Sequence, residues 1–267
     1  SWSIYFIGRR LSRAKGIGFL CGSMFLISRM AYYQIGQVLG LMETMALWMA
    51  VMILWYLFRY LNEKDSHVYF YLSCVLYFGV CFVHERYMAL FPLLLLVLLF
   101  KRSRKLWEWG AGLLSFLLVQ IIRAFTIGSI LPAGTGGTQV ADTFSLADTF
   151  KYALSQIAYV FGINAGPEHL NGCPWGQSPL AIKGLVLLAD ACIAVIVLAF
   201  LVKLVREKRK EYRVQMLKNS TLFILFTGLC IASSSVTIRV EMRWVYVSLV
   251  SLSLIHISEP TRLGMIS

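Results

Sequence analysis

Charged residues are scarce in this sequence. Only 14% of its 267 residues are Asp, Glu, Lys or Arg, whereas soluble domains carry about a quarter. Hydrophobic residues make up 58% of the chain, and the mean hydropathy is +0.71. This composition excludes an ordinary soluble domain and predicts an all-α, multispanning transmembrane helical bundle.

Two further classes of protein are excluded by what the sequence has little of. The six cysteines are spread along the chain and only Cys173 lies in a long loop, so neither a disulfide framework nor a cysteine-rich metal site is indicated. The net charge of +12 would suggest nucleic acid in a soluble chain, but the basic residues here fall in short segments between apolar runs. We therefore expect no nucleic-acid partner, and we interpret the charge as a signal of membrane orientation.

Long apolar runs are what the sequence does contain. They predict about eight membrane spans, at residues 16–33, 40–60, 68–83, 87–100, 110–130, 180–205, 221–238 and from 244 onward. The chain then divides into a first membrane region, a long loop, a second membrane region and a tail, at residues 1–130, 131–179, 180–251 and 252–267.

Both ends of the sequence suggest a fragment. It begins with Ser1, lacks a signal-like start, and its first apolar piece, 2–8, is too short to span a bilayer, so we expect it to begin inside a larger protein. Residues 252–262 resemble the translated end of a transposase adapter used to prepare sequencing libraries. We interpret residues 252–267 as an artefact and assign them no function.

The basic residues predict an orientation. Alternating spans place most of the 25 Lys and Arg residues on one side, in segments 9–15, 59–64, 101–105 and 203–218. The positive-inside rule assigns that side to the cytoplasm and the loop 131–179 to the outside. We therefore expect a multi-pass protein of the cell membrane, most simply the bacterial cytoplasmic membrane.

The long loop is expected to carry one amphipathic helix. Ser145 with Asp148 predicts a helix N-terminus, and apolar residues recur at helical spacing before Gly162, at Leu146, Phe150, Leu154, Ile157 and Phe161. Such a helix lies on the outer membrane face. It either forms a lid packed on the spans or lines a substrate groove.

Three ionisable residues, His84, Glu85 and Arg86, stand between two apolar runs and so at the tip of a predicted outer hairpin. Ionisable groups near a bilayer are costly unless they pair or bind something polar, which makes them a candidate site. The alternative is an ordinary hydrated loop. His84 is a candidate proton relay in this triplet, and a single His is no metal site.

Glu43 and Glu85 are the carboxylates best placed for acid or base catalysis at the outer face. Glu43 lies three residues into a predicted span, where a carboxylate could activate an acceptor hydroxyl or orient a divalent metal. The structural alternative is an ion pair with Arg29 or Arg86. Asp190, seven residues after Lys183, is interpreted as a member of a charge pair.

Arginine suits bidentate binding of phosphate, so outer arginines predict a phosphorylated lipid headgroup as ligand. Arg86, Arg239 and Arg243, with Glu241 beside the last two, are the candidate substrate-binding residues along with His84. Arg29, Arg123 and Lys183 fall in the outer ends of spans, where each must snorkel, pair, or hold an anion.

The segment Tyr5-Phe-Ile-Gly-Arg-Arg-Leu-Ser-Arg-Ala-Lys-Gly-Ile-Gly18, the pair Tyr32-Tyr33 and the acidic Glu43 resemble the early membrane region of GT-C glycosyltransferases. The similar branch contains protein O-mannosyltransferases and bacterial lipid A aminoarabinose transferases. The resemblance covers residues 1–130. It implies a helical bundle that uses a polyprenyl-phosphate sugar as donor at the outer face.

The resemblance also has gaps. Glu43 matches the position of the family's second outer acidic residue, whereas the family's main catalytic acid lies upstream of Ser1, so the fragment is expected to lack its own catalytic base. The triplet and the segment 239–243 match no motif of the family.

The function expected from the sequence is therefore transfer of a sugar from a polyprenyl-phosphate donor outside the membrane. One alternative is a transporter or flippase for an anionic amphipathic substrate, which would show inverted repeats and broken spans. No repeat is visible, and Pro92 alone interrupts a span. Another alternative is an O-antigen polymerase or ligase, which would share the outer arginines without the early pattern.

Overall fold

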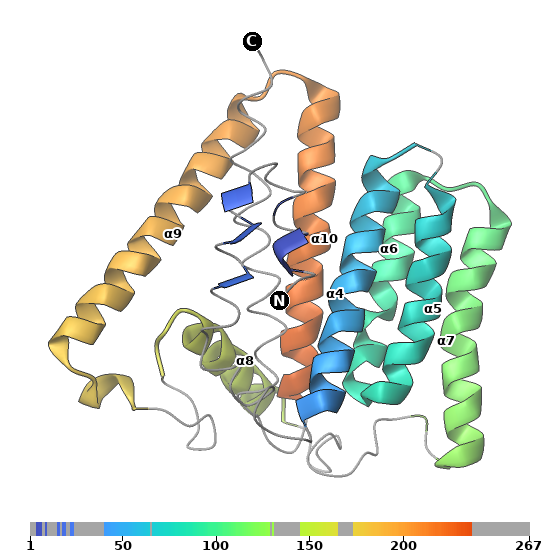
Figure 1. The fold of residues 1–267 in the computed structure, drawn as a ribbon, viewed down its shortest axis with the longest axis horizontal. Helices are drawn as coiled ribbons and strands as arrows, with labels where there is room; N and C mark the ends of the chain where they lie inside the picture. The colour runs from blue at the N-terminus through green and yellow to red at the C-terminus, as the bar shows by residue number, and fades with distance from the viewer. Residues whose placement is uncertain are drawn as a thin grey trace.

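The computed structural model describes residues 40–64, 66–128, 145–164 and 173–236, together with residues 4–6, 9, 15–16, 18–19, 22–23 and 130 (Figure 1). This described part is all helical and contains no strand. Within it, four helices are long and apolar enough to cross a membrane: Leu41–Asn62, Leu106–Thr126, Leu180–Arg206 and Lys210–Ser235. The prediction of an all-α chain with several candidate membrane spans is confirmed at this level. Most of the first predicted span, the last span and the tail lie outside the described residues.

Helices α4 (Gly40–Asn62) and α5 (His67–Val83) form the central hairpin of the bundle. Their buried faces make the apolar core, and Leu54 and Leu57 are fully enclosed there. The two helices are in close contact at Gly79, where an added Cβ would lie 2.7 Å from Cε, the end of the flexible Met49 side chain. Close approach of this kind is typical of helix contacts in membranes, where small residues let backbones meet.

The prediction of one continuous membrane span over residues 87–100 is wrong. The chain instead forms a 3₁₀ helix, η1 (Glu85–Leu90), followed by α6 (Phe91–Lys101), which has 11 residues. Pro92 stands in the first turn of α6, where its missing N–H costs nothing, so it starts a helix and does not interrupt one. The left-handed Arg102 ends α6.

Helix α7 (Leu106–Thr126) packs on α5 and α6, and the rings of Phe91 and Phe116 stack with centroids 4.3 Å apart. Helix α10 (Lys210–Ser235) packs on α4, α6 and η1. The basic stretch 206–218 was predicted as a loop, and this is wrong from Lys210 onward. Lys, Arg, Gln and Glu favour helix, so the chain coils before its apolar part begins.

Helix α8 (Leu146–Val160) confirms the predicted amphipathic helix. Ser145 Oγ accepts a hydrogen bond from the Asp148 N–H at 3.3 Å, and Gly162 ends the helix in the left-handed region at φ +76°. Its apolar residues Leu146 and Phe150 are exposed, and its buried residues are polar. The helix therefore turns its apolar face away from the bundle, as an interfacial helix does.

Helix α9 (Leu180–Arg206) matches the predicted span 180–205 to within one residue. None of its described side chains is buried, and Figure 1 shows it leaning away from α10. A short 3₁₀ helix, η3 (Trp175–Gln177), precedes it.

The connections between helices alternate between two ends of the bundle. The turns 62–67, 101–106 and 206–210, which carry the basic residues, lie at one end, and Figure 1 shows them together at the top. The start of α4, η1, the end of α10 and α8 lie at the other end. We call these the basic end and the Glu43 end.

Candidate functional site

Glu43 is the centre of a buried polar group at the end of the bundle opposite the basic turns. It stands in the first turn of α4, where its Oε1 lies 3.1 Å from His84 Nε2 and its Oε2 accepts a hydrogen bond from Arg86 Nη2 at 2.9 Å. All three side chains are buried. The chain brings together two members of the predicted triplet with the predicted carboxylate, and we call Glu43, His84, Arg86 and Tyr87 the Glu43 cluster.

The triplet is not a hydrated loop. Its last member, Arg86, also donates a hydrogen bond to Tyr87 Oη at 3.3 Å, and its guanidinium lies 5.1 Å from the centre of the Tyr87 ring. A buried cation of this kind is tolerated because a carboxylate and further polar contacts replace its hydration. The structural alternative weighed from the sequence, a Glu43–Arg86 pair, is thus present in the structure.

His84 closes α5 and turns its imidazole toward Glu43. The backbone N–H of His84 donates to Val80 O at 2.8 Å, which fixes the end of the helix. Its Nδ1 is buried and has no hydrogen-bond partner among the described residues. If the Nε2–H donates to the carboxylate, Nδ1 carries the lone pair and is able to accept a proton.

Glu85, the other predicted catalytic carboxylate, points elsewhere. Arg123 of α7 holds both of its oxygens, with Nη1 3.2 Å from Oε1 and Nη2 3.2 Å from Oε2. This two-pronged contact fastens α7 to η1. Of the three roles considered for Arg123, pairing is the one that the structure shows.

Other predicted residues fall outside this group. Arg29, Arg239, Glu241 and Arg243 lie outside the described residues, so their proposed roles stay predictions. Lys183 donates to Gly176 O at 3.2 Å.

Of the two charge pairs predicted for Asp190, within its helix or between helices, the first is absent from the structure and the second stays a prediction. The two side chains form no ion pair in α9, although both are described. Seven residues span two helical turns, about 10 Å, and this distance exceeds the reach of a direct contact.

A second buried carboxylate was missed. Glu108, whose side chain is fully enclosed at the basic end, accepts hydrogen bonds from Tyr60 Oη at 2.6 Å and from Ser103 Oγ, and contacts His67 Nδ1. Lys105 Nζ lies 2.7 Å from His67 Nε2 and continues this chain to the surface. The predicted span began at residue 110, which placed Glu108 in a loop and hid a carboxylate in the first turn of a buried helix.

The described residues offer no ready metal site. No three His, Cys, Asp or Glu side chains gather within this part of the chain. Glu43, the carboxylate considered as a metal ligand, already uses both oxygens for His84 and Arg86.

No known protein family, curated protein or solved structure matches this chain.

Proposed function

We propose that this protein is a membrane glycosyltransferase of the GT-C type, which transfers a sugar from a polyprenyl-phosphate donor to an acceptor hydroxyl at the outer end of its helical bundle. The observation that carries the proposal is the Glu43–His84 contact: a buried imidazole oriented by a carboxylate, with Nδ1 left without a hydrogen-bond partner among the described residues. The resemblance of residues 1–130 to early GT-C spans is the second support.

The Glu43–His84 contact fits a general base, and the proposed step requires that the acceptor hydroxyl reach Nδ1, which is buried in the structure. In the proposed step the acceptor oxygen forms a new bond to the anomeric carbon of the sugar, while the bond from that carbon to the phosphate oxygen breaks. Polyprenyl phosphate leaves with the bonding electrons, and the hydroxyl proton passes to His84 Nδ1. Glu43 holds the imidazole by Nε2 and balances the cation that forms, as the third member of a nucleophile–base–carboxylate arrangement does.

This proposal changes the role first considered for two residues, and it places a base, His84, in a chain that the resemblance implied would lack one. Glu43 orients the base and is not itself the base, because its oxygens are engaged by His84 and Arg86. Arg86 holds Glu43 in place, and the donor phosphate is assigned to Arg239 and Arg243, with Glu241 between them.

The test is a transfer assay in membranes that contain the full-length protein, with a panel of radiolabelled polyprenyl-phosphate sugars as donors. His84→Gln keeps a nitrogen near Glu43 but has no group that accepts a proton. We expect polyprenyl-phosphate release to slow by about 10²- to 10⁴-fold, the usual contribution of a general base. His67→Gln is the matched control, since His67 also contacts a buried glutamate but lies at the basic end.

Equal rates in the His84 variant and the unmodified protein would remove His84 as the base. Absence of sugar transfer from every donor in the panel would overturn the proposal that the protein is a glycosyltransferase. Both variants are compared at equal protein amounts in the membrane, so that loss of folding is not counted as loss of catalysis.

A transporter for an anionic amphipathic substrate is the second candidate, and one observation favours it. Helix α7 is tied to its neighbours at both ends, by Arg123 with Glu85 at one end and by Glu108 with His67 at the other. Pairs at opposite ends that break alternately would let one part of the bundle rock against another. In reconstituted vesicles, a labelled polyprenyl-phosphate sugar that crosses the bilayer without cleavage would support transport over transfer.

A further inference from the structure

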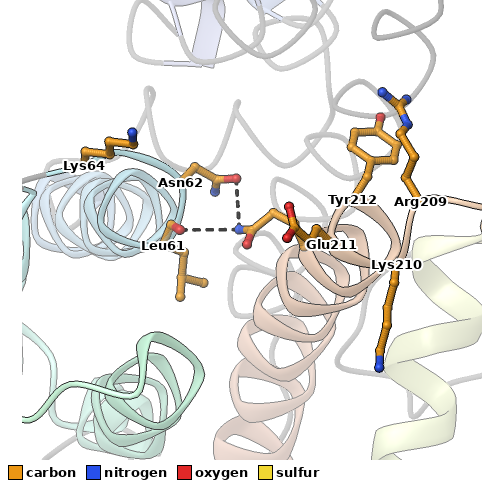
Figure 2. Close-up of a pocket in the computed structure, with 8 residues that line it drawn as sticks. Leu61, Asn62, Lys64, Arg209, Lys210, Glu211 and Tyr212 are labelled. Atoms are coloured by element: carbon orange, nitrogen blue, oxygen red, sulfur yellow. Dashed lines mark hydrogen bonds between the residues drawn. The ribbon is translucent and has the colours of Figure 1, made fainter.

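The basic end of the bundle contains an open cleft of about 890 Å³ that belongs to neither buried cluster (Figure 2). One wall is formed by the end of α4 and the turn after it, with Leu61, Asn62 and Lys64. The other wall is the start of α10, with residues 209–212 and Gln215. This volume falls within the range of small-ligand sites, about 300–1,000 Å³.

The base of the cleft is held by a network of amides. Gln215 Nε2 donates to Asn62 Oδ1 at 3.1 Å, and Asn62 and Asn219 exchange two hydrogen bonds, at 3.0 and 3.1 Å. The bonds from Gln215 to Leu61 O and Asn62 Oδ1 join the two walls, and the dashed lines in Figure 2 end at Leu61 and Asn62. The walls are therefore fixed relative to one another before any ligand arrives, which lowers the entropy cost of binding.

The charge of the cleft is positive. Three basic side chains, Lys64, Arg209 and Lys210, line it against one acidic side chain, Glu211. Figure 2 shows Lys64 and Arg209 on opposite walls near the same edge, while Lys210 is directed away.

The two cations at this edge are available to a ligand. Lys64 forms no ion pair with any acidic residue that the structure describes. Arg209 contacts Glu207 Oε1 through Nε at 3.2 Å, and this geometry leaves its two terminal nitrogens pointing outward on a side chain that is 62% exposed. Both side chains line the cleft, and each carries a positive charge that attracts a phosphate bound in it.

The position of the cleft suggests the source of such a phosphate. Its walls are the end of the candidate span Leu41–Asn62 and the polar first turns of the helix Lys210–Ser235, so it lies beside the membrane surface. Leu61 and the ring of Tyr212 give it an apolar side next to its basic side. The positive-inside rule assigns this end to the cytoplasm, whose leaflet carries anionic lipids that bind in basic pockets between helices.

We propose that this cleft binds the phosphate headgroup of an anionic membrane phospholipid, with Lys64 and Arg209 as its ligands. The site lies at the end of the bundle opposite the Glu43 cluster. This lipid-binding proposal does not depend on whether the protein transfers a sugar.

The test uses the full chain reconstituted in nanodiscs of phosphatidylcholine with a small fraction of phosphatidylglycerol, and native mass spectrometry reads the lipid that stays bound. We expect phosphatidylglycerol to be retained in preference to phosphatidylcholine. Lys64→Gln with Arg209→Gln should weaken that retention about thirtyfold, since each basic residue near an anionic surface contributes about fivefold. Glu211→Gln should strengthen retention by about fivefold.

The matched control removes two charges from the same stretch outside the cleft, with Arg206→Gln and Lys208→Gln. Equal weakening in the two double variants would overturn the proposal in favour of general attraction to the membrane. Displacement of the lipid by soluble glycerol 3-phosphate at the same phosphate concentration would overturn the lipid assignment in favour of a soluble ligand. If the Lys64 and Arg209 double variant fails to fold, unchanged retention in Glu211→Gln would overturn the proposal.

Discussion

Glu43 Oε1 lies 3.1 Å from His84 Nε2, although 41 residues separate the two along the chain. The contact joins the first turn of α4 to the end of α5, and both side chains are buried. Removing a carboxylate and an imidazole from water costs several kcal/mol unless new polar contacts replace the lost hydration. Arg86 supplies part of that replacement, so the stability of the cluster depends on all three residues together.

The first prediction concerns the buried pair Glu43–Arg86. Arg86→Met should destabilise the protein by about 3–5 kcal/mol, because it leaves a buried carboxylate without its cation. Glu43→Gln should lower the free energy of unfolding by a similar amount, because it removes the carboxylate that pairs with the buried Arg86. The double variant should recover much of the loss, since neither unpaired charge remains. Chemical unfolding of the purified protein in detergent measures the three values.

The partly exposed pair Arg59–Glu63 is the matched control for this experiment. Its guanidinium lies 2.7 Å from the carboxylate, as close as a buried pair, but the side chains are 19% and 39% exposed. Its removal should cost about 1 kcal/mol or less. Additive losses at Glu43 and Arg86 would show that the two residues do not act as a pair.

Local sequence patterns predicted much of the fold. The apolar run 180–205 corresponds to α9, and Ser145 with Asp148 marks the start of α8, because hydropathy and capping depend on residues close together in the chain. The pattern located Glu43 and His84 as unusual polar residues. Their contact could not be deduced, since it depends on how α4 and α5 pack.

The predictions from hydropathy were wrong where a helix begins with polar residues. Glu108 and the stretch 210–218 were assigned to loops, because hydropathy detects the apolar part of a helix and misses its polar first turns. The Arg123–Glu85 contact could not be predicted from the sequence either, because 38 residues separate the partners. Pairing of charges across helices requires the tertiary arrangement.

Glu108 carries the second prediction. Glu108→Gln replaces one acceptor oxygen by a donor and removes the charge that three donors share, so we expect a loss of about 2–4 kcal/mol in the free energy of unfolding. Tyr60→Phe removes a single hydrogen bond to the same carboxylate and should cost about 1 kcal/mol. Unfolding in detergent compares the two. A smaller loss in the Glu108 variant than in the Tyr60 variant would contradict the role of Glu108 as the shared acceptor.

The third prediction concerns the orientation in the membrane. Cys173 is exposed in the loop before α9, which the positive-inside rule places outside. A membrane-impermeant maleimide should therefore label it in intact cells. In a Cys173→Ser background, Lys208→Cys at the basic end should be labelled only after the cells are permeabilised. Labelling of the Lys208 position in intact cells would reverse the topology and move the lipid cleft to the outer leaflet.

The last prediction tests how α8 is held against the bundle. Gln156 is fully buried, and its amide accepts from Ser234 Oγ at 2.7 Å and donates to Ser235 Oγ at 2.8 Å. Gln156→Leu removes both bonds, while each serine keeps a backbone carbonyl of α10 as partner, so the cost should be about 1–2 kcal/mol and confined to α8. Hydrogen exchange of residues 146–160 should become about 5- to 30-fold faster, with α4 and α5 unchanged. Ser155→Ala is the control, because the Ser155 hydroxyl bonds only within its own helix, to Lys151 O. Equal acceleration in both variants would mean that apolar contacts, and not the Gln156 amide, fasten α8 to the end of α10.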